Sequence, residues 1–226
     1  MPERGPAPPQ TETELLERVR GIAGLRLSEL AQALNFPPPG RATSAKGWAG
    51  ELLERALGAD AGNRPIPDFT NLGIELKTVP INVRGAPQES TYVCRAPSRV
   101  SPEMRWHNSL ARHKLAHVLW LPVEAATETD IGRRRIGWGF LWRPNATQEA
   151  LLQADWEELV ELLATGRHEE INARLGLLMQ LRPKARDASY RDVGADETGA
   201  PGAVSPRGFY LRARFTAEIL AAGMTS

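Results

Sequence analysis

The stretch from residue 73 to residue 79 alternates between apolar and polar residues, a period of two that is typical of a β-strand. Because neighbouring side chains on a strand point to opposite faces, Glu75 and Lys77 project from one face and their neighbours project into a core. Turn-forming residues 71–73 precede the strand, so the chain from Asp68 is expected to fold back as a hairpin. The pattern therefore predicts a strand that places Asp68 beside Glu75 and Lys77.

Helical and strand-like patterns also occur elsewhere, without the strict alternation of a doubly wound fold. Thr11 and Glu14 have the spacing of a capping box and predict the start of a helix. Thr147 predicts the cap of another helix, which Gly166 ends, and the polar, glycine-rich residues 187–205 predict a mobile loop. The mixture predicts a mixed α/β fold, with helices at residues 11–22, 28–34, 45–57, 147–165 and from 216, and strands at residues 91–94, 118–123, 177–181 and 209–211.

The length of 226 residues fits one domain or two small lobes. The proline-rich residues 1–10 predict a disordered lead-in, which leaves residues 11–226 as a single bilobed domain. No run approaches the roughly 18 apolar residues of a membrane helix, and the N-terminus lacks the apolar core of a secretory signal. Cys94 is the one cysteine and permits no internal disulfide, as expected in the reducing cytoplasm.

The net charge of +1, from 28 Lys and Arg against 27 Asp and Glu, indicates no nucleic-acid partner by itself. The charges are segregated along the chain, however. Residues 149–161 carry five acids and no base, residues 174–191 carry five bases against Asp187, and residues 205–217 add three arginines. Such a field can steer a polyanion to one face, although solvated helix faces would give the same pattern.

The two carboxylates and the ammonium group of the predicted hairpin suggest a hydrolytic metal site. Mg²⁺ prefers oxygen ligands, takes one or two carboxylates such as those of Asp68 and Glu75, and keeps waters and substrate phosphate in its other positions. The metal would polarise a scissile phosphate and lower the pKa of a bound water, while Lys77 would orient that water or stabilise the developing charge. A surface strand with Glu75 and Lys77 facing solvent is the structural alternative.

A predicted helix at residues 45–57 carries Glu54 on one stripe with Gly47 and Gly50, and Gly58 lies just beyond. Small residues around one carboxylate would let other backbone approach it closely. A glutamate with no role in a site is the alternative.

A basic stretch further along the chain allows two interpretations. His113 and His117 are four residues apart, a spacing that can bind zinc on a helix, but no acidic third ligand or HExxH pattern accompanies them. Arg112 and Lys114 suit contacts with phosphate better. We therefore expect a phosphate contact here and not a zinc site.

One long run closely resembles the MutH family of mismatch repair endonucleases, which belong to the restriction-endonuclease-like PD-(D/E)xK nucleases: KGWAGELLERALGADAGNRPIPDFTNLGIELKTVP, residues 46–80. It contains the signature literally, as Pro67-Asp68 followed by Glu75-Leu76-Lys77. The resemblance covers most of residues 12–222, because further segments follow in the family's order: RHKL at 112–115, VLWLPVE at 118–124, DWEELVELL at 155–163, LRPKA at 181–185 and PRGFYLRARFT at 206–216.

The resemblance implies a restriction-endonuclease-like core with two lobes that form a DNA-binding cleft. It assigns Asp68 and Glu75 as metal ligands and Lys77 as the catalytic lysine, in agreement with the interpretation from the residues. Glu54 matches a further acidic position, where it would hold a metal-bound water or a second ion. Lys114 would lie near the scissile phosphate. The implied cofactor is Mg²⁺, and Mn²⁺ or Ca²⁺ can occupy the same site.

The same resemblance places DNA recognition in other segments. The GATC-reading loop of the family matches at residues 182–184, where cationic side chains can donate to guanine O6 and N7. Tyr210 matches the position associated with sensing the adenine, and Tyr92 stands where we expect Phe, as a ring that can wedge or stack against bases. The implied DNA-binding residues, each with a structural or phosphate-only role as the alternative, are Lys46, Glu89, Tyr92, Arg182, Pro183, Lys184 and Tyr210.

The function implied by the resemblance is strand-specific nicking in methyl-directed mismatch repair. The protein would cut the unmethylated strand of double-stranded DNA 5′ of the guanine at hemimethylated GATC sites, as a monomer associated with the nucleoid in the bacterial cytoplasm. A MutL-type ATPase would activate it after a MutS-type protein has recognised a mismatch. The alternatives are a type II restriction-like enzyme that cuts both strands at GATC, which usually needs two active sites, and a non-catalytic DNA-binding module.

Overall fold

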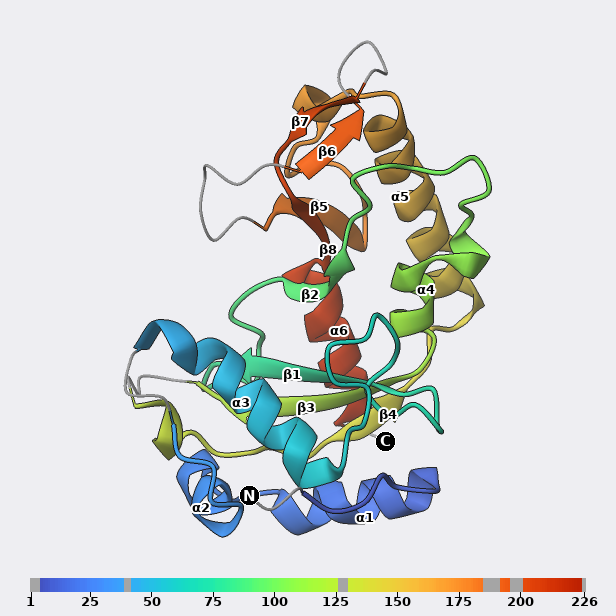
Figure 1. The fold of residues 1–226 in the computed structure, drawn as a ribbon. Coiled ribbons are helices and arrows are strands. Elements are labelled where there is room, and N and C mark those ends of the chain that lie inside the picture. The colour runs from blue at the N-terminus through green and yellow to red at the C-terminus, as the bar shows by residue number, and fades with distance from the viewer. Residues whose placement is uncertain (1–4, 39–41, 126–129, 185–191, 196–200, 225–226) are drawn as a thin grey trace. The chain divides into compact units, whose positions relative to one another are not determined.

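The computed structural model describes residues 5–38, 42–125, 130–184, 192–195 and 201–224 (Figure 1). They form two compact units, of which the first contains Met1–Glu89, His117–Arg143 and Ala217–Ser226, and the second contains Ser90–Ala116 and Pro144–Thr216. Helices and strands occur in both units, so the predicted mixed α/β class is confirmed. Across the described ranges, no helix is both long enough and apolar enough to span a bilayer.

The first unit is built on a three-stranded sheet in the order β1-β3-β4. Strands β1 and β3 are parallel, and β4 pairs with β3 in the antiparallel sense. Helix α3 lies across this sheet (Figure 1). The elements of the unit are β1 (Glu75–Ile81), β3 (Val118–Glu124), β4 (Phe140–Trp142), α1 (Glu12–Ile22), α2 (Leu27–Ala33), α3 (Ala42–Leu57) and the 3-10 helix η2 (Ile131–Arg133).

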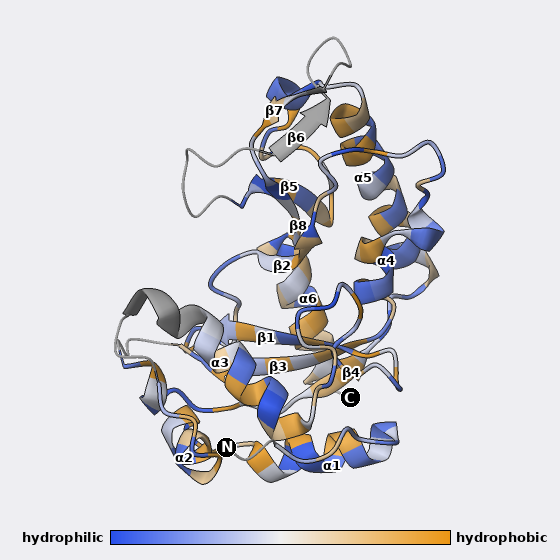
Figure 2. Ribbon diagram, viewed as in Figure 1, coloured by the Kyte–Doolittle hydropathy of each residue, from blue (hydrophilic) through white to orange (hydrophobic). Residues whose placement is uncertain are grey.

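The core of the first unit forms because one stripe of α3 and one face of β1 are apolar. Leu52 and Leu53 of α3 are fully buried, and so is Ile74 just before β1. Leu76 joins them with apolar residues of β3 in one cluster, and Figure 2 shows apolar and polar residues alternating around α1 and α3. The buried apolar face fixes the register of β1, since a slip by one residue would turn its charged side chains into this core.

The second unit contains the antiparallel sheet β2-β8-β5, in which β8 is the central strand. A bulge interrupts β2 between Tyr92 and Cys94. Helix α6 begins in this unit and ends in the first. The elements are β2 (Thr91–Arg95), β5 (Met179–Pro183), β8 (Arg207–Leu211), the hairpin β6 (Asp192–Ala195) and β7 (Pro201–Val204), α4 (Leu110–Leu115), α5 (Ala146–Ala164), α6 (Ala213–Gly223) and the 3-10 helices η1 (Trp106–Asn108) and η3 (His168–Glu170).

Several predictions for the second unit are wrong. Helix α6 begins at Ala213 and not at residue 216, and β8 begins at Arg207 and not at residue 209. Asn145 caps α5, because its side chain accepts the Gln148 N–H at 2.9 Å, so the helix starts before Thr147. The predicted loop at residues 187–205 contains the β6–β7 hairpin, whose glycine-rich strands lack an alternating pattern. Strand β5 starts at Met179 and not at residue 177, because the preceding backbone binds a buried carboxylate.

That carboxylate belongs to Asp155, which is buried inside α5. It accepts hydrogen bonds from three consecutive backbone N–H groups, at 2.7 Å from Leu177, 2.6 Å from Leu178 and 2.8 Å from Met179. Leu177 and Leu178 are held by this carboxylate outside the ladder, and the sheet begins at the end of the run, where Met179 pairs with Leu211. Asp155 thus fixes where β5 leaves α5.

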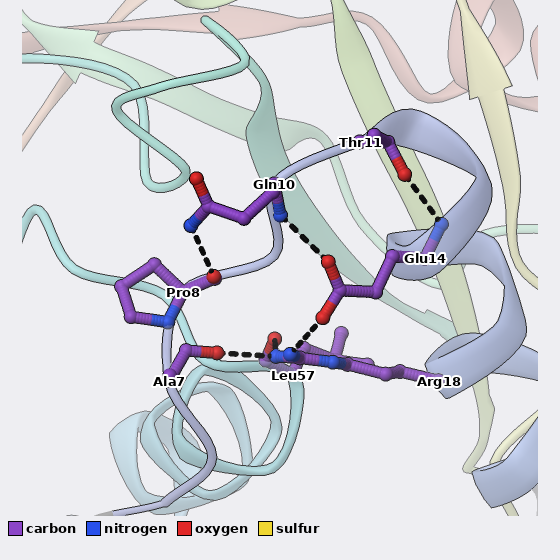
Figure 3. Close-up of polar contacts among 7 residues, drawn as sticks. All are labelled: Ala7, Pro8, Gln10, Thr11, Glu14, Arg18 and Leu57. Carbon is purple, nitrogen blue, oxygen red and sulfur yellow. Dashed lines mark hydrogen bonds and ion pairs between the residues drawn. The ribbon is translucent and has the colours of Figure 1, made fainter.

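Arg18 ties the N-terminal segment to two helices of the first unit (Figure 3). Its guanidinium donates to the carbonyl of Ala7 at 2.7 Å, to the carbonyl of Leu57 at 2.8 Å and to the carboxylate of Glu14 at 2.5 Å. Gln10 N–H also donates to Glu14, and this bond, acting with Arg18 against partial desolvation, lowers the pKa of that carboxyl. These bonds give residues 5–10 a defined path along α1 and the end of α3, and residues 1–4 lie outside the described ranges. The division into a lead-in at residues 1–10 and a single bilobed domain at residues 11–226 stays a prediction.

Gly58 ends α3 at the point where this segment crosses it, and we expect Gly58→Ala to destabilise the protein. Its φ of +83° disfavours any other residue, and a Cβ would lie 2.6 Å from the Arg18 guanidinium and 2.7 Å from the carbonyl of Ala7. Backbone strain of this kind costs about 1–3 kcal/mol. Urea unfolding followed by tryptophan fluorescence measures the loss. The control is Gly21→Ala in α1, where a Cβ meets nothing within 4 Å; equal midpoints for the two variants would contradict the expectation.

Candidate functional site

The predicted hairpin places Asp68 against the start of β1. The N–H of Phe69 donates to the carbonyl of Ile74 at 2.9 Å, which closes the turn. The Asp68 carboxylate then accepts the N–H of Leu76 at 2.8 Å. Because that N–H belongs to the peptide that follows Glu75, the structure brings the first predicted carboxylate to the backbone of the second.

Glu75 and Lys77 form a buried ion pair on β1, with 2.6 Å between the Lys77 Nζ and a Glu75 carboxylate oxygen. The residues are only 3% and 8% exposed, so the alternative of a solvated surface strand is wrong. Glu75 pairs with Val118 of β3, and its N–H donates at 3.0 Å to the carbonyl of His117, the residue before that strand. Burial and then the nearby Arg143 charge lower the pKa of His117, against the opposing effect of Glu12.

A second carboxylate, which the sequence did not single out, supports the loop that carries Asp68. Asp60 accepts the backbone N–H of Thr70 at 2.9 Å and its hydroxyl at 2.5 Å. The N–H groups of Asp60 and Ala61 in turn donate to the carbonyl of Asp68, at 3.0 and 3.2 Å. Desolvation works to raise the pKa of Asp60, but the bonds from Thr70, the bond from its own backbone N–H and the Arg64 charge together lower it. The loop is thus closed from both ends around Asp68.

Glu54 lies half-buried in α3, in the same unit as these residues. The glycines of its stripe do not mark a close backbone approach, because a Cβ at Gly47 or Gly50 would meet nothing within 4 Å. The approach occurs at Gly58 and involves the N-terminal segment. Between residues 5 and 224, leaving aside the undescribed stretches, no three His, Cys, Asp or Glu residues are grouped as a metal site. A role for Glu54 beside Asp68 and Glu75 stays a prediction.

The chemistry of the remaining donors fits Mg²⁺. Asp68 and Glu75 supply hard carboxylate oxygens and no sulfur or imidazole, which is the donor set that this cation prefers. One or two carboxylates are enough, because Mg²⁺ keeps waters and substrate oxygens in its remaining positions. The ammonium group of Lys77 completes a group of charges suited to a phosphodiester substrate.

Four of the predicted DNA-binding residues meet on the sheet of the second unit, and we call them the recognition cluster: Tyr92, Arg182, Lys184 and Tyr210. The two tyrosine rings pack edge to face with centroids 5.2 Å apart. The Arg182 guanidinium lies 5.6 Å from the Tyr210 centroid. The Lys184 ammonium lies 3.7 Å from the Tyr92 centroid and donates to the Tyr92 hydroxyl. Each cation thus rests on an aromatic face.

The other predicted contacts are less tightly defined. Pro183 is exposed at the end of β5, and Glu89 is exposed at the end of a loop in the first unit. Lys46 lies in α3, outside the residues whose side chains the structure describes. Lys114 lies in α4 of the second unit, so its place near the scissile phosphate stays a prediction.

The zinc alternative has no support from the helix that it requires. His113 lies in α4 and is exposed, whereas α4 ends at Leu115, before the buried His117. The two rings therefore do not share a helix face. The basic stretch has a different anchor, since Arg112 and the Trp106 indole N–H both donate to one carboxylate oxygen of Glu149, each at 2.8 Å.

Comparison with known proteins gives one consistent result. The family model described as DNA mismatch repair enzyme MutH matches residues 57–155. The DNA mismatch repair protein MutH of Pasteurella multocida is 50% identical over 212 residues, which cover 94% of this chain and 96% of the relative. The MutH protein of Shewanella amazonensis is 47% identical, over 95% of this chain and 96% of the relative. The MutH protein of Serratia proteamaculans is also 47% identical, over 96% of this chain and 95% of the relative. Because identity of this size extends over nearly the whole of both chains, the protein belongs to the MutH family of DNA mismatch repair enzymes.

Proposed function

We propose that this protein nicks the unmethylated strand of hemimethylated GATC sites, immediately 5′ of the guanine, in a reaction that depends on Mg²⁺. Family membership makes the chain a DNA-cleaving hydrolase of mismatch repair. The observation that carries the proposal is the buried Glu75–Lys77 pair with the Asp68 carboxylate bonded to the peptide beside it. Burying such a group of charges costs free energy, and buried charged groups of this kind are typical of functional sites. Hydrolysis of a phosphodiester would account for them.

Asp68 and Glu75 are the residues that would hold Mg²⁺, with Mn²⁺ or Ca²⁺ as occupants of the same site, and Glu54 is the proposed third acidic group. When bound, the cation supplies Lewis acidity toward the phosphate and neutralises its negative charge. Lys77 holds a positive charge at a fixed point, 2.6 Å from Glu75, and stabilises the charge that develops on the phosphate oxygens. Water is largely excluded there, which strengthens each of these interactions. Lys114 is proposed to contact the same phosphate.

The recognition cluster is proposed to read the site. Arg182 and Lys184 carry the donors that pair with guanine O6 and N7, and Pro183 between them restricts the backbone, so less entropy is lost on binding. Tyr210 is proposed to pack against the adenine and to reject the added methyl group on N6 sterically. Tyr92 is proposed to stack or wedge against bases, and Lys46 and Glu89 to contact the DNA from the first unit.

The proposed setting is the bacterial nucleoid, where a MutL-type ATPase activates the protein after a MutS-type protein has found a mismatch. A monomer suffices for a single nick, because the chain contains one Asp68 to Lys77 motif. A cut through both strands would require two active sites.

The test is incubation of the purified protein with supercoiled plasmid that carries one hemimethylated GATC, with and without Mg²⁺ and a MutL-type protein. Breaks are mapped by strand-specific primer extension. A Mg²⁺-dependent nick in the unmethylated strand is expected. Cuts in both strands would instead support a restriction enzyme, and binding without a break even with the activator would support a non-catalytic module.

We expect Asp68→Asn and Glu75→Gln each to abolish nicking while DNA binding is retained. The substitutions remove the carboxylate charge that would hold the cation and leave the size of the side chain unchanged. Single-turnover nicking and gel-shift binding in Ca²⁺ measure the two properties separately. Glu51→Gln is the matched control, because Glu51 is an exposed carboxylate on α3. Substantial residual nicking by either variant would exclude the proposed ligand role.

We expect Lys77→Met to lose turnover and to lose about 3 kcal/mol of unfolding free energy, because it removes the ammonium group that pairs with the buried Glu75 carboxylate. The double variant Glu75→Gln with Lys77→Met should recover much of that free energy and remain inactive. Chemical denaturation and single-turnover kinetics of the three variants separate folding from catalysis. Unchanged turnover in Lys77→Met would remove Lys77 from the active site.

We expect Arg182→Ala to lose sequence preference, at a cost of about 1–3 kcal/mol if Arg182 donates two hydrogen bonds to a guanine. The measurement is the cleavage rate on GATC duplexes and on duplexes with one altered base pair. Arg174→Ala, which removes an arginine close to β5 in sequence, is the control. An equal loss on both duplexes would identify Arg182 as a phosphate contact.

A further inference from the structure

We propose that Gly208 is a positioning residue that determines the selectivity of the recognition cluster, because it leaves the space in which the two tyrosine rings lie. This inference rests on the proposed function. It assigns a role in DNA discrimination to a residue without a side chain of its own.

Gly208 lies at the centre of the sheet face that carries the cluster. In β8 it is directly opposite Arg182 of β5 on one side and Arg95 of β2 on the other. Tyr210, two residues further along β8, is directly opposite Tyr92. Directly opposite residues of antiparallel strands project from the same face, and so do residues two apart on one strand. A side chain at position 208 would therefore stand among Tyr92, Tyr210 and Arg182.

There is no room for that side chain. A Cβ on Gly208 would lie 2.8 Å from a ring carbon of Tyr92, closer than the 3.0 Å below which Cβ atoms are essentially never found. It would also lie 3.2 Å from a ring carbon of Tyr210 and 3.2 Å from the carbonyl of Cys94. Either the Tyr92 ring or the strand must move if the glycine is replaced.

The requirement for glycine at position 208 is one of space and not of backbone conformation. The glycines with positive φ in the described chain are those at 24, 58, 62, 73, 85, 166 and 176, and Gly208 is not among them. Alanine can adopt its extended backbone, and the sheet hydrogen bonds of β8 can persist. The Tyr92 ring is a side chain, with more freedom to turn than a paired strand, so we expect the ring to yield.

Movement of the rings would displace the cations that rest on them. Lys184 lies 3.7 Å from the Tyr92 centroid and is bonded to the Tyr92 hydroxyl. Tyr92 packs in turn against Tyr210, and Arg182 lies over Tyr210. One methyl group at position 208 thus reaches both base-reading cations through the two rings. Hydrolysis depends on other residues, so selectivity should change more than the rate of bond cleavage.

The experiment compares the full-length protein with Gly208→Ala on three Mg²⁺-containing reactions: a hemimethylated GATC duplex, the same duplex with one altered base pair, and a fully methylated GATC duplex. We expect the ratio of cleavage between the first and second duplexes to fall about tenfold or more, within the range that one misplaced bidentate contact allows. Cleavage of the fully methylated duplex, relative to the first, should rise. Gly21→Ala is the control and should leave both ratios unchanged.

A double-mutant cycle tests whether Gly208 acts through the ring. Tyr92→Leu removes the ring carbon that a Cβ would meet, so Gly208→Ala added to Tyr92→Leu should lower the selectivity ratio less than twofold further. Full additivity of the two changes would overturn the proposal, and so would unchanged ratios in Gly208→Ala. If Gly208→Ala fails to fold, the double-mutant cycle still tests the steric role through folding. Recovery of folding in the Tyr92→Leu background supports the steric role, and unfolding in both backgrounds overturns it.

The wild-type protein separates failure of this inference from failure of the proposed function. Absence of GATC preference in the wild type would refute the proposed specificity, and the inference would fall with it. Preference in the wild type that Gly208→Ala retains would refute the inference alone.

Discussion

The buried ion pair between Glu75 and Lys77 is the constraint on which the first unit depends. Two opposite charges on β1 have left water, and their attraction does not by itself repay that loss of hydration. The other face of the strand supplies the balance, since Ile74 and Leu76 enter the core that α3 and β3 complete. The alternation of residues 73–79 thus places core residues on one face and the proposed catalytic residues on the other. The loop closed by Asp60 and Thr70 then brings Asp68 to the same strand.

The second unit holds the cationic side chains of the recognition cluster at its surface. Arg182 and Lys184 are exposed, and each lies over an aromatic ring. An aromatic ring orients a cation through its quadrupole and carries no charge of its own, which suits the proposed role of these cations in attracting DNA. The rigid base is the three-stranded sheet, whose strand β5 is fixed by the three hydrogen bonds to Asp155.

Local patterns in the sequence predicted the features that depend on near neighbours. The period-two stretch gave β1 and the position of Glu75 and Lys77, and the turn residues before it gave the hairpin to Asp68. Contacts between residues distant in the sequence were not predictable in this way. Asp60 and Thr70 are ten residues apart, Asp155 and Met179 are twenty-four apart, and neither pair has a periodic signal. Strand β4 is only three residues long and half-buried, which is too short for a pattern to register.

The glycines show most clearly why some features could not be predicted from the sequence. The sequence contains 20 glycines, and its pattern suggested a close approach at Gly47 and Gly50 as much as at Gly58. Three-dimensional contacts distinguish Gly58, which the N-terminal segment approaches, and Gly208, which the tyrosine rings approach, from Gly47 and Gly50, which nothing approaches. The recognition cluster itself was identified through resemblance to a family, because residues from β2, β5 and β8 converge only in the folded sheet.

The contrast between the two sites also predicts how each responds to ions in solution. Dissolved salt screens interactions between exposed charges that are more than about 10 Å apart, and this distance shortens as the salt concentration rises. A buried ion pair is screened far less. The proposed binding of Arg182 and Lys184 to DNA should therefore weaken as the salt concentration rises. Binding releases counterions from the DNA, and this release becomes less favourable when the solution already contains more salt. The Glu75–Lys77 pair, at 2.6 Å inside the unit, should keep its geometry under the same conditions. Ionic strength is thus expected to change DNA binding and site discrimination, whereas packing within the first unit sets the positions of the proposed catalytic groups.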